Sequence, residues 1–477
     1  MRRKFLSVLL VAAMTTTLFG CGDKDSSKDS STGSNSDTST GSDDTAATGD
    51  EESDVPENEI TGDASAADAF VVWGWNEDIK KILDGPFAED HPDEYKRIVF
   101  VNTGGSDYYQ SKVDEILMDE SNEIYPDVMG LEVDYVKKYT NSDYLLSADD
   151  LGISADDMAN MYQYNLDLGS DESGAVKALF WQATPACYAV RADLAEEYLG
   201  TTDPAEIAKS FESWDAMYAA AKDISEASGG YCKLLGGYDE MKRPLTNSRT
   251  VGFYDENSNI TIDENITRYL ELVQQFASED LTFGTTQWGD DWNAVMTGDG
   301  KTSNAALAYY GCPWFVYWCL NADVWSGNTI LVEGPTQSFW GGTGLAATIG
   351  CADKELAGTI IKYITCDAEA MVKINELNAD FVNNTAALET IIANASDASV
   401  SGNGFLYADA KQNFIEFFKP LAEGINASTV TAEDQSILAA LDTQAKEVAS
   451  GNKDIDTAIA DFKASVHDTF DYLNVVD

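Results

Sequence analysis

Two tryptophans end an apolar run in the stretch FVVWGWNED at residues 70–78, and polar side chains follow at once. Flat indole rings stack on the C–H faces of a pyranose, while amides and carboxylates hydrogen-bond its hydroxyl groups. We therefore predict that Trp75, Asn76 and Glu77 bind a sugar and that Trp73 packs in the core. A core position for both tryptophans is an equally good interpretation, because large aromatic side chains are usually buried.

Two further apolar runs end in side chains of the same kinds. Two glycines close the run at 97–105, and Tyr108 follows at the start of a predicted helix. Glu132 and Asp134 stand at the end of the run at 127–133, and they share one face of a strand because side chains alternate. A ligand contact is open for all three residues. The alternatives are a core role for Tyr108 and a helix cap for Asp134.

Aromatic residues recur beside glycine and proline in the second half of the chain. Tyr310 and Trp314 stand in YYGCPWF, a stretch that predicts a loop, and Trp340 precedes two glycines. Packing explains large aromatic side chains less easily in a loop than inside an element, so we predict ligand contacts for these three. Trp288 and Trp292 are four residues apart, a spacing more often found on the buried face of a helix.

Other site chemistries lack the residues that they need. The chain has only His91 and His467, and it has no GxSxG, HExxH, Walker or GxGxxG motif, so Ser-His-Asp and Cys-His catalysis are disfavoured. The cysteines are scattered without a CxxC pair, and they are either free or paired as disulfides. The stretch at 255–266 lacks the glycine and glutamate of a calcium loop and predicts a hairpin followed by a helix cap. We expect no metal and no cofactor.

The elements that position these residues alternate along the chain. Short apolar runs predict strands at 70–75, 97–105, 127–133, 183–190, 305–311 and 343–350. Helical spacing of apolar residues predicts helices at 76–90, 107–121, 191–199, 211–228, 354–377, 431–450 and 453–470. Strands and helices that alternate across short loops are typical of parallel crossover units, so the predicted fold class is α/β.

The N-terminal residues and the charge indicate where the protein works. Residues 1–20 combine three basic residues with a short apolar segment, which is typical of a signal peptide. The tetrapeptide LFGC at 18–21 resembles the lipobox of bacterial lipoproteins, which implies a lipidated Cys21; an ordinary signal peptide is the alternative. Residues 22–67 predict a flexible acidic linker of Ser, Thr and Gly. The net charge of −52 repels nucleic acid and anionic lipid.

Several segments together resemble the family 1 extracellular solute-binding lipoproteins of bacterial carbohydrate ABC importers, which are similar to maltose-binding protein. The matching segments are VVWGWNED, YPDVMGLEVDYVKKY (125–139), FWQATPACYAVRADLAEEYLG (180–200), ALAYYGCPWF (306–315), the glycine-rich strand and helix at 341–370, and the terminal helix at 450–466. The resemblance implies a two-lobe periplasmic-binding-protein-like fold of type II, with ligand between lobes joined by crossing segments. It implies a first lobe at 68–182 and 335–382, and a second lobe at 183–334 and 383–477.

The resemblance also implies roles for single residues and for the whole chain. It favours ligand contacts for Glu132 and Asp134, selects Trp292 over Trp288, and places Gln182 at a crossing where its amide meets a hydroxyl. The expected protein is a monomeric, non-catalytic binding component on the outer face of the cytoplasmic membrane. There it captures an oligosaccharide, closes by a hinge and delivers the sugar to an ABC permease. The alternative is a surface glycoside hydrolase, which needs two opposed carboxylates.

Overall fold

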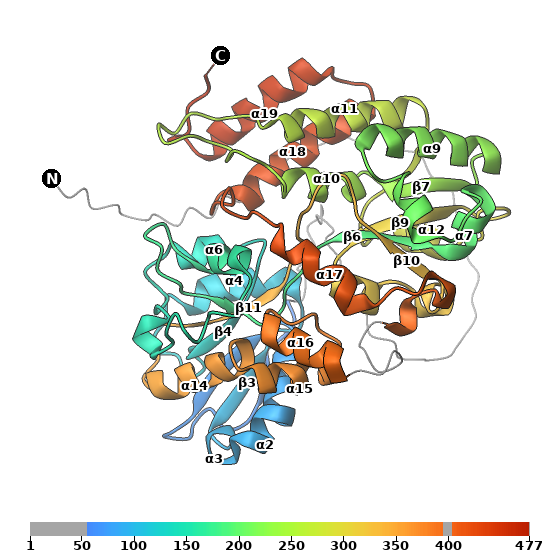
Figure 1. Cartoon of the computed structure of the whole chain (residues 1–477). Helices are drawn as coiled ribbons and strands as arrows, with labels where there is room; N and C mark the ends of the chain where they lie inside the picture. The colour runs from blue at the N-terminus through green and yellow to red at the C-terminus, as the bar shows by residue number, and fades with distance from the viewer. Residues whose placement is uncertain (1–54, 395–402, 477) are drawn as a thin grey trace, which may run out of the picture. The chain divides into compact units, whose positions relative to one another are not determined.

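Two mixed β-sheets organise the chain, as Figure 1 shows. The computed structural model describes residues 55–394 and 403–476, and all of them belong to one structural unit. The predicted signal peptide, Cys21 and residues 22–54 of the predicted linker lie outside the described residues. The linker prediction is wrong at residues 59–61, which form a strand at the edge of the first sheet because they pair with residues 100–102. Strands from both sheets alternate with helices along the sequence, so the predicted α/β class is confirmed.

The first sheet has the strand order β1-β3-β2-β4-β11-β5. Its members are β1 (Glu59–Thr61), β2 (Phe70–Gly74), β3 (Ile98–Asn102), β4 (Val128–Glu132), β5 (Leu179–Phe180) and β11 (Thr343–Ala347). The strand β2 pairs in parallel with both β3 and β4, as the crossover pattern predicts, whereas β11 is antiparallel to β4. Parallel strands end at one edge of a sheet, so the residues that follow β2, β3 and β4 share that edge.

Helices accompany the first sheet. They are α1 (Asp78–Ile82), η1 (Leu83–Phe87), α2 (Ala88–Asp90), α3 (Pro92–Tyr95), α4 (Ser106–Ile116), α5 (Val136–Thr140), η2 (Asp149–Leu151), α6 (Gln163–Gly169), α14 (Lys354–Thr365), α15 (Ala368–Asn378) and α16 (Thr385–Asn394). The single helix predicted at 354–377 is two helices. The side chain of Asp367 accepts from the backbone N–H groups of Glu369 and Ala370, and this cap starts α15 as a new helix.

The second sheet has the order β10-β6-β9-β7-β8. Its members are β6 (Cys187–Arg191), β7 (Cys232–Gly237), β8 (Thr282–Thr285), β9 (Ala305–Gly311) and β10 (Thr329–Val332). The strand predicted at 183–190 starts later, because residues 183–186 pair with other crossing segments. Strands β7, β8 and β10 are absent from the sequence-based prediction.

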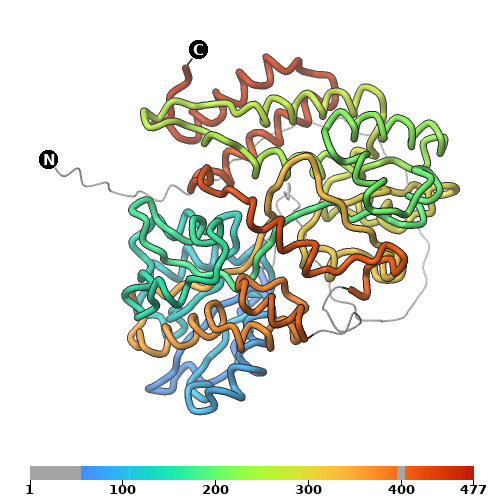
Figure 2. Tube along the Cα trace, in the orientation of Figure 1, coloured from blue at the N-terminus to red at the C-terminus, as the bar shows by residue number. Residues whose placement is uncertain are grey.

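Further helices complete the chain. They are α7 (Ala192–Tyr198), α8 (Pro204–Ala208), α9 (Trp214–Ser228), α10 (Asp239–Thr246), α11 (Glu264–Ser278), α12 (Asp290–Thr297), η3 (Phe315–Cys319), α13 (Ala322–Trp325), η4 (Asn403–Phe405), η5 (Ala408–Ala410), α17 (Phe414–Glu423), α18 (Asp434–Ala449) and α19 (Ile455–Thr469). The C-terminal helices α18 and α19 return to pack on α11, as Figures 1 and 2 show. The predicted hairpin and cap at 255–266 are confirmed by a Tyr254–Ile260 bridge and by Asp263 at the start of α11.

Three crossing segments, at 181–186, 338–343 and 380–384, connect the two sheets. The backbone of Ala183 donates to Phe381 at 2.8 Å, and the backbone of Ala186 donates to Ser338 at 2.9 Å. Isolated bridges pair residue 182 with 382 and residue 185 with 339. Short ladders of this kind hold the segments side by side while leaving the sheets on either side separate.

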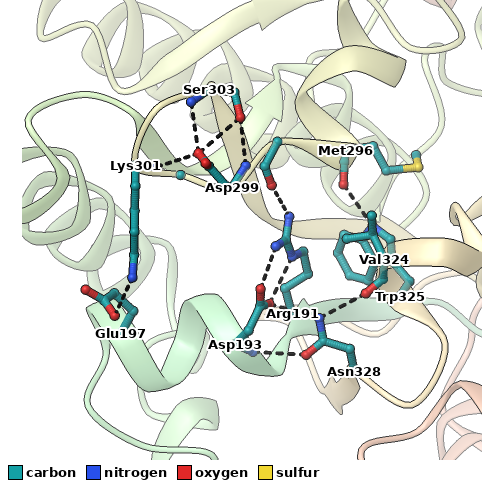
Figure 3. A network of polar contacts seen from close by, with 12 residues as sticks. Arg191, Asp193, Glu197, Met296, Asp299, Lys301, Ser303, Val324, Trp325 and Asn328 are labelled. Carbon is teal, nitrogen blue, oxygen red and sulfur yellow. Dashed lines mark hydrogen bonds and ion pairs between the residues drawn. The ribbon is translucent and has the colours of Figure 1, made fainter.

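The end of β6 that is remote from the crossing carries the polar network of Figure 3. The buried Arg191 donates from Nε and Nη2 to both oxygens of Asp193, at 3.0 and 2.6 Å, and from Nη1 to the carbonyl of Gly298. Asn328 donates to the same Asp193 at 2.9 Å. The charge of Arg191 is thereby neutralised, and the network anchors two loops to α7.

Six cysteines lie in the described part of the chain, and all six are free thiols. Burial raises the pKa of the Cys319 and Cys351 thiols to about 12, which keeps them protonated. Within residues 55–394 and 403–476, no group of three His, Cys, Asp or Glu side chains is placed to hold a metal ion. None of the helices in these ranges is long and apolar enough to cross a membrane.

Candidate functional site

Several aromatic side chains gather where a crossing segment meets the second sheet. The ring of Trp340 lies 5.1 Å from Trp314, 5.8 Å from Trp288 and 5.2 Å from Phe315, measured between centroids. Trp288 in turn lies 5.3 Å from Trp292. We call Trp288, Trp292, Trp314, Phe315 and Trp340 the aromatic cluster. Two of the predicted site residues, Trp314 and Trp340, are thus direct neighbours.

Trp314 lies at the start of a helical turn and not in the predicted loop. Strand β9 continues through Gly311, and η3 follows with Trp314 as its N-cap residue. A Cβ at Gly311 would lie 2.0 Å from the ring of Phe315, so only glycine lets the chain turn back this tightly. The turn leaves Trp314 half-buried while Phe315 packs beneath it.

Trp288 belongs to the cluster, although its spacing to Trp292 suggested a buried helix stripe. It precedes α12, and its φ angle of 70° lies in the left-handed region. A bulky residue in that region is uncommon, and such strain concentrates at functional sites. The glycine that follows Trp288 is the only sequence signal for this turn. Trp288 remains half-buried, so it offers more surface to a ligand than Trp292 does.

The carboxylate of Glu132 meets the aromatic cluster at Gly341. A Cβ added to Gly341 would lie 2.8 Å from Glu132 Oε1 and 3.4 Å from the ring of Trp314. The end of β4 in the first sheet therefore faces the ring of Trp314, which follows β9 of the second sheet. Glu132 also accepts from the backbone N–H of Asp134 at 2.6 Å. Burial, followed by the nearby charge of Asp134, raises the pKa of the Glu132 carboxyl well above its usual range.

Arg243 adds a positive charge that the sequence analysis did not select. It lies on α10, and its Nη1 donates to Asp134 Oδ2 at 3.2 Å. Its guanidinium carbon is 4.7 Å from the centroid of the Trp340 ring, a cation–π contact. Nothing in the sequence around Arg243 distinguishes it from a surface arginine, because the contact depends on where α10 packs.

Three predicted site residues are buried: Trp292 and Trp340, which belong to the cluster, and Tyr310, with Trp340 at 3% exposure. Trp292 is 1% exposed, and its Nε1 donates to the buried Glu240 at 2.9 Å. Tyr310 is 2% exposed near the end of β9, where its hydroxyl hydrogen-bonds Ser338. β9 and α12 turn these two side chains into the core, and a ligand contact for either of them stays a prediction.

Gln182 lies at the crossing, as the resemblance implies, but its side chain is already hydrogen-bonded. Its Oε1 accepts from the backbone N–H of Thr343 at 2.9 Å, and its Nε2 donates to Asp380 at 2.7 Å. These bonds use both ends of the amide. Gln182 therefore joins crossing segments in this structure, and its contact with a hydroxyl stays a prediction.

The residues that follow β2 and β3 lie at the same edge of the first sheet as Glu132. Trp75 is half-buried and packs edge-to-face on Tyr109 at 5.0 Å. Asn76 accepts from the backbone of Asp78, and Glu77 accepts from Asn102 at 2.8 Å. Tyr108 is half-buried on α4. No ring contact among the described residues joins Trp75 to Trp314 or Trp340, so the roles of Trp75, Asn76, Glu77 and Tyr108 stay predictions.

Two surface hollows of about 210 and 390 Å³ lie elsewhere on the first-sheet part of the chain. One is lined by Thr61, Tyr95 and Phe100, and the other by Lys112 and Ile124. Neither includes a residue of the aromatic cluster. We place the candidate site at the cluster because rings, carboxylates and a guanidinium from both sheets converge there, whereas each hollow is lined by the first-sheet part alone.

Comparisons with solved structures identify the fold. A family 1 extracellular solute-binding protein superposes with a TM-score of 0.71 at 17% identity, covering 85% of this chain and 100% of that one. The GacH receptor of Streptomyces glaucescens, solved unliganded and with acarbose, gives 0.62 at 20% identity, covering 85% and 98%. An ABC transporter associated binding protein from B. animalis subsp. lactis, in complex with β-1,6-galactobiose, gives 0.62 at 17% identity, with the same coverage.

Sequence comparisons add no closer relation. No protein-family model matches the chain, and no curated relative matches its sequence. The structural neighbours named above are solute-binding proteins at identities of 20% or less, so the likeness concerns the fold. The chain therefore has the two-lobe, type II periplasmic-binding-protein fold that the sequence resemblance predicts.

Proposed function

We propose that the protein binds an oligosaccharide at the aromatic cluster and serves as the binding component of a carbohydrate ABC importer. One observation carries the proposal: Glu132 of the first sheet and Trp314 of the second meet at Gly341, on a crossing segment. A sugar at this point touches both sheets. Such a ligand favours the arrangement in which the sheets approach each other, because only that arrangement provides all of its contacts.

The chemistry of the residues supports a sugar. Trp314 and Trp288 are half-buried rings able to stack on a pyranose, and Glu132 and Asp134 supply oxygen acceptors at the rim. Aromatic stacking contributes about 0.5–1.5 kcal/mol per pair, and hydrogen bonds to charged groups about 1.5–3 kcal/mol. A micromolar dissociation constant requires about −8 kcal/mol, which a few such contacts supply.

Structural neighbours support the ligand class and the partner. The GacH receptor was solved with acarbose, and the protein from B. animalis subsp. lactis with β-1,6-galactobiose. By analogy, we propose an ABC permease as the partner, a non-catalytic role and a monomeric state. We also propose that a lipid on Cys21 tethers the chain to the outer face of the membrane, with the linker as spacer.

A saccharide screen tests the proposal. The full chain, purified in detergent, is titrated with maltotriose, cellotriose, xylotriose, acarbose and β-1,6-galactobiose while tryptophan fluorescence and melting temperature are recorded. Binding raises the melting temperature by mass action. At a sugar concentration 100 times the dissociation constant, the folded state gains about 2.7 kcal/mol of stability. A chain that shifts with none of these sugars contradicts the proposal, and turnover of a bound sugar would favour the glycoside hydrolase instead.

A further inference from the structure

Arg243 ties the two sheets together beside the aromatic cluster. It lies on α10, which packs on the second sheet, and its Nη1 donates to Asp134, just past the end of β4 in the first sheet. Its guanidinium carbon lies over the Trp340 ring, 4.7 Å from the ring centroid. The Asp134 carboxylate and the Trp340 ring thus hold the Arg243 side chain on two sides. Arg243 therefore has little conformational freedom left to lose when a ligand binds.

The Nε–H group of Arg243 lacks an acceptor. The atom is buried, and no residue in the described ranges hydrogen-bonds it. A buried donor left without a partner costs about 1–3 kcal/mol. An oxygen atom placed at this N–H would remove that cost. The site therefore favours a molecule that brings an acceptor to this point when the two sheets are in contact.

Arg249 has similar surroundings but lies away from the contact between the two sheets. Its Nε is also buried without a partner, its guanidinium lies 3.8 Å from the Phe253 ring, and it pairs with Asp434 at 2.5 Å. All of these groups belong to the second-sheet part of the chain, and the Arg249 side chain is 1% exposed. The Arg243 side chain is 19% exposed and pairs across the sheets, so a ligand between the sheets meets Arg243 and not Arg249.

We propose that Arg243 is a ligand-binding residue that donates from Nε to a hydroxyl or ring oxygen of a neutral saccharide, and that the carboxylates around it exclude acidic sugars. The inference rests on the proposed function and deepens it by naming the class of sugar. The ligand supplies the hydrogen-bond acceptor that the Nε–H group of Arg243 lacks, so contact between the sheets becomes more favourable when a sugar is present.

The charges around Arg243 explain the preference for an uncharged acceptor. Burial lowers the pKa of the guanidinium, but Asp134, Glu132 and Asp239 outweigh it and raise that pKa. The positive charge is thus already balanced by the carboxylates of Asp134 and Asp239. A uronate entering the site would meet these carboxylates at close range, and like charges that approach each other in a partly buried site repel strongly.

Two substitutions separate the Nε–H group from the charge. Arg243→Lys keeps a positive charge opposite Asp134 but has no N–H at the position of Nε. Arg243→Gln removes the charge but places its amide N–H at about that position. Arg249→Lys is the matched control, because Arg249 has the same stacked and ion-paired surroundings outside the site.

Affinities of the full chain in detergent are measured by calorimetry for the saccharides of the screen and for trigalacturonate as the acidic probe. We expect Arg243→Lys to raise the dissociation constant of the bound neutral sugar at least tenfold, and Arg243→Gln to stay within threefold of wild type. Arg249→Lys should lower the melting temperature and leave the dissociation constant unchanged. Trigalacturonate should bind the wild type at least tenfold more weakly than a neutral trisaccharide.

The outcomes distinguish the two proposals. If the wild type binds a sugar and Arg243→Lys binds it with the same affinity, the role of Arg243 is overturned and the proposed function stands. The same holds if Arg243→Gln loses as much affinity as Arg243→Lys, because the donor at Nε would then not matter. Tighter binding of trigalacturonate overturns the exclusion of acidic sugars. A wild type that binds neither neutral nor acidic saccharides overturns the proposed function and this inference with it.

Discussion

Gln182 and Asp380 hydrogen-bond across two crossing segments, with 2.7 Å between Nε2 and Oδ1. The other end of the same amide accepts from the backbone of Thr343 on the third segment. Trp181 Nε1 donates to the second oxygen of Asp380 at 3.1 Å. One glutamine therefore joins all three segments between the sheets, and we call Gln182, Asp380, Thr343 and Trp181 the hinge clasp.

Gln182→Leu should destabilise the fold strongly. Leucine has a similar volume but leaves the buried Asp380 and the N–H of Thr343 without their partner, so we expect a loss of about 2–4 kcal/mol in the free energy of unfolding. Urea denaturation measures the loss. Gln435→Leu is the control, since Gln435 shares only an exposed amide pair with Gln110 and should change stability by about 0.5 kcal/mol or less. Equal losses in the two variants would contradict the role of the clasp.

The stability of the protein should depend on the protonation of Asp380. Burial raises the pKa of this carboxyl to about 7, despite the hydrogen bond from Gln182. The pKa in an unfolded chain is about 3.9, so between pH 4 and 7 the folded chain binds more protons than the unfolded one. Stability therefore falls as pH rises through this window, by up to about 1.4 kcal/mol per pH unit, and levels off above it.

Asp380→Asn checks this dependence because asparagine does not titrate. Urea denaturation from pH 4.5 to 8 should give a shallower fall for Asp380→Asn than for the wild type. The remaining slope includes Glu240, whose pKa burial also raises to about 7. Asp143→Asn, at an exposed position, is the control and should reproduce the wild-type slope. A curve for Asp380→Asn parallel to that of the wild type would refute the assignment.

The sequence predicts the first sheet better than the second for a physical reason. Strands β2, β3 and β4 are apolar runs buried on both faces, and glycine or acidic residues mark their ends. The second sheet includes β8 and β10, which have only four residues each, too short for a period to be recognised. Strand β7 ends in two glycines, which resemble a turn when read in isolation.

The site is predictable only where local sequence fixes the surroundings. Trp314 and Trp340 stand beside glycine or proline, and their rings are neighbours. Tyr310 and Trp292 lie on regular elements, and periodicity alone does not tell which face meets the core. Arg243 becomes part of the site only because α10 brings it across to Asp134. Contacts of that kind depend on the packing of distant segments.

Cys21→Ser should release the protein from the membrane. Residues 18–21 resemble a lipobox, and a thioether-linked lipid requires the cysteine sulfur. Fractionation of a bacterial host that expresses the chain should move the protein from the membrane fraction to the soluble fraction. Cys319→Ser, which changes a thiol within the second-sheet part, should leave it on the membrane. Retention of the Cys21→Ser chain on membranes would argue against a lipid anchor.

Trp314→Ala should remove most of the affinity for sugar. The half-buried Trp314 ring is the cluster member that meets both Gly341 and Trp340, so we expect at least a tenfold rise in the dissociation constant, consistent with about 1.4 kcal/mol or more. Trp318→Ala is the comparison: Trp318 lies on the same turn but is 60% exposed and has no ring contact with the cluster among the described residues. Its removal should change the constant less than threefold. Similar losses would place the ligand elsewhere on the turn.

Gly341→Ala tests the meeting point of Glu132 and Trp314 directly. Gly341 has a φ of +62°, and a Cβ there would stand 2.8 Å from Glu132 Oε1. The new methyl group must displace the carboxylate or the ring, so sugar affinity should fall at least tenfold. Gly152→Ala shares the backbone strain, with a φ of +71°, but its Cβ would meet nothing within 4 Å. Both variants should lose about 1–2 kcal/mol of stability from the left-handed backbone, and only Gly341→Ala should lose binding. Equal affinities in calorimetric titrations of the two variants would show that the ligand does not use this point.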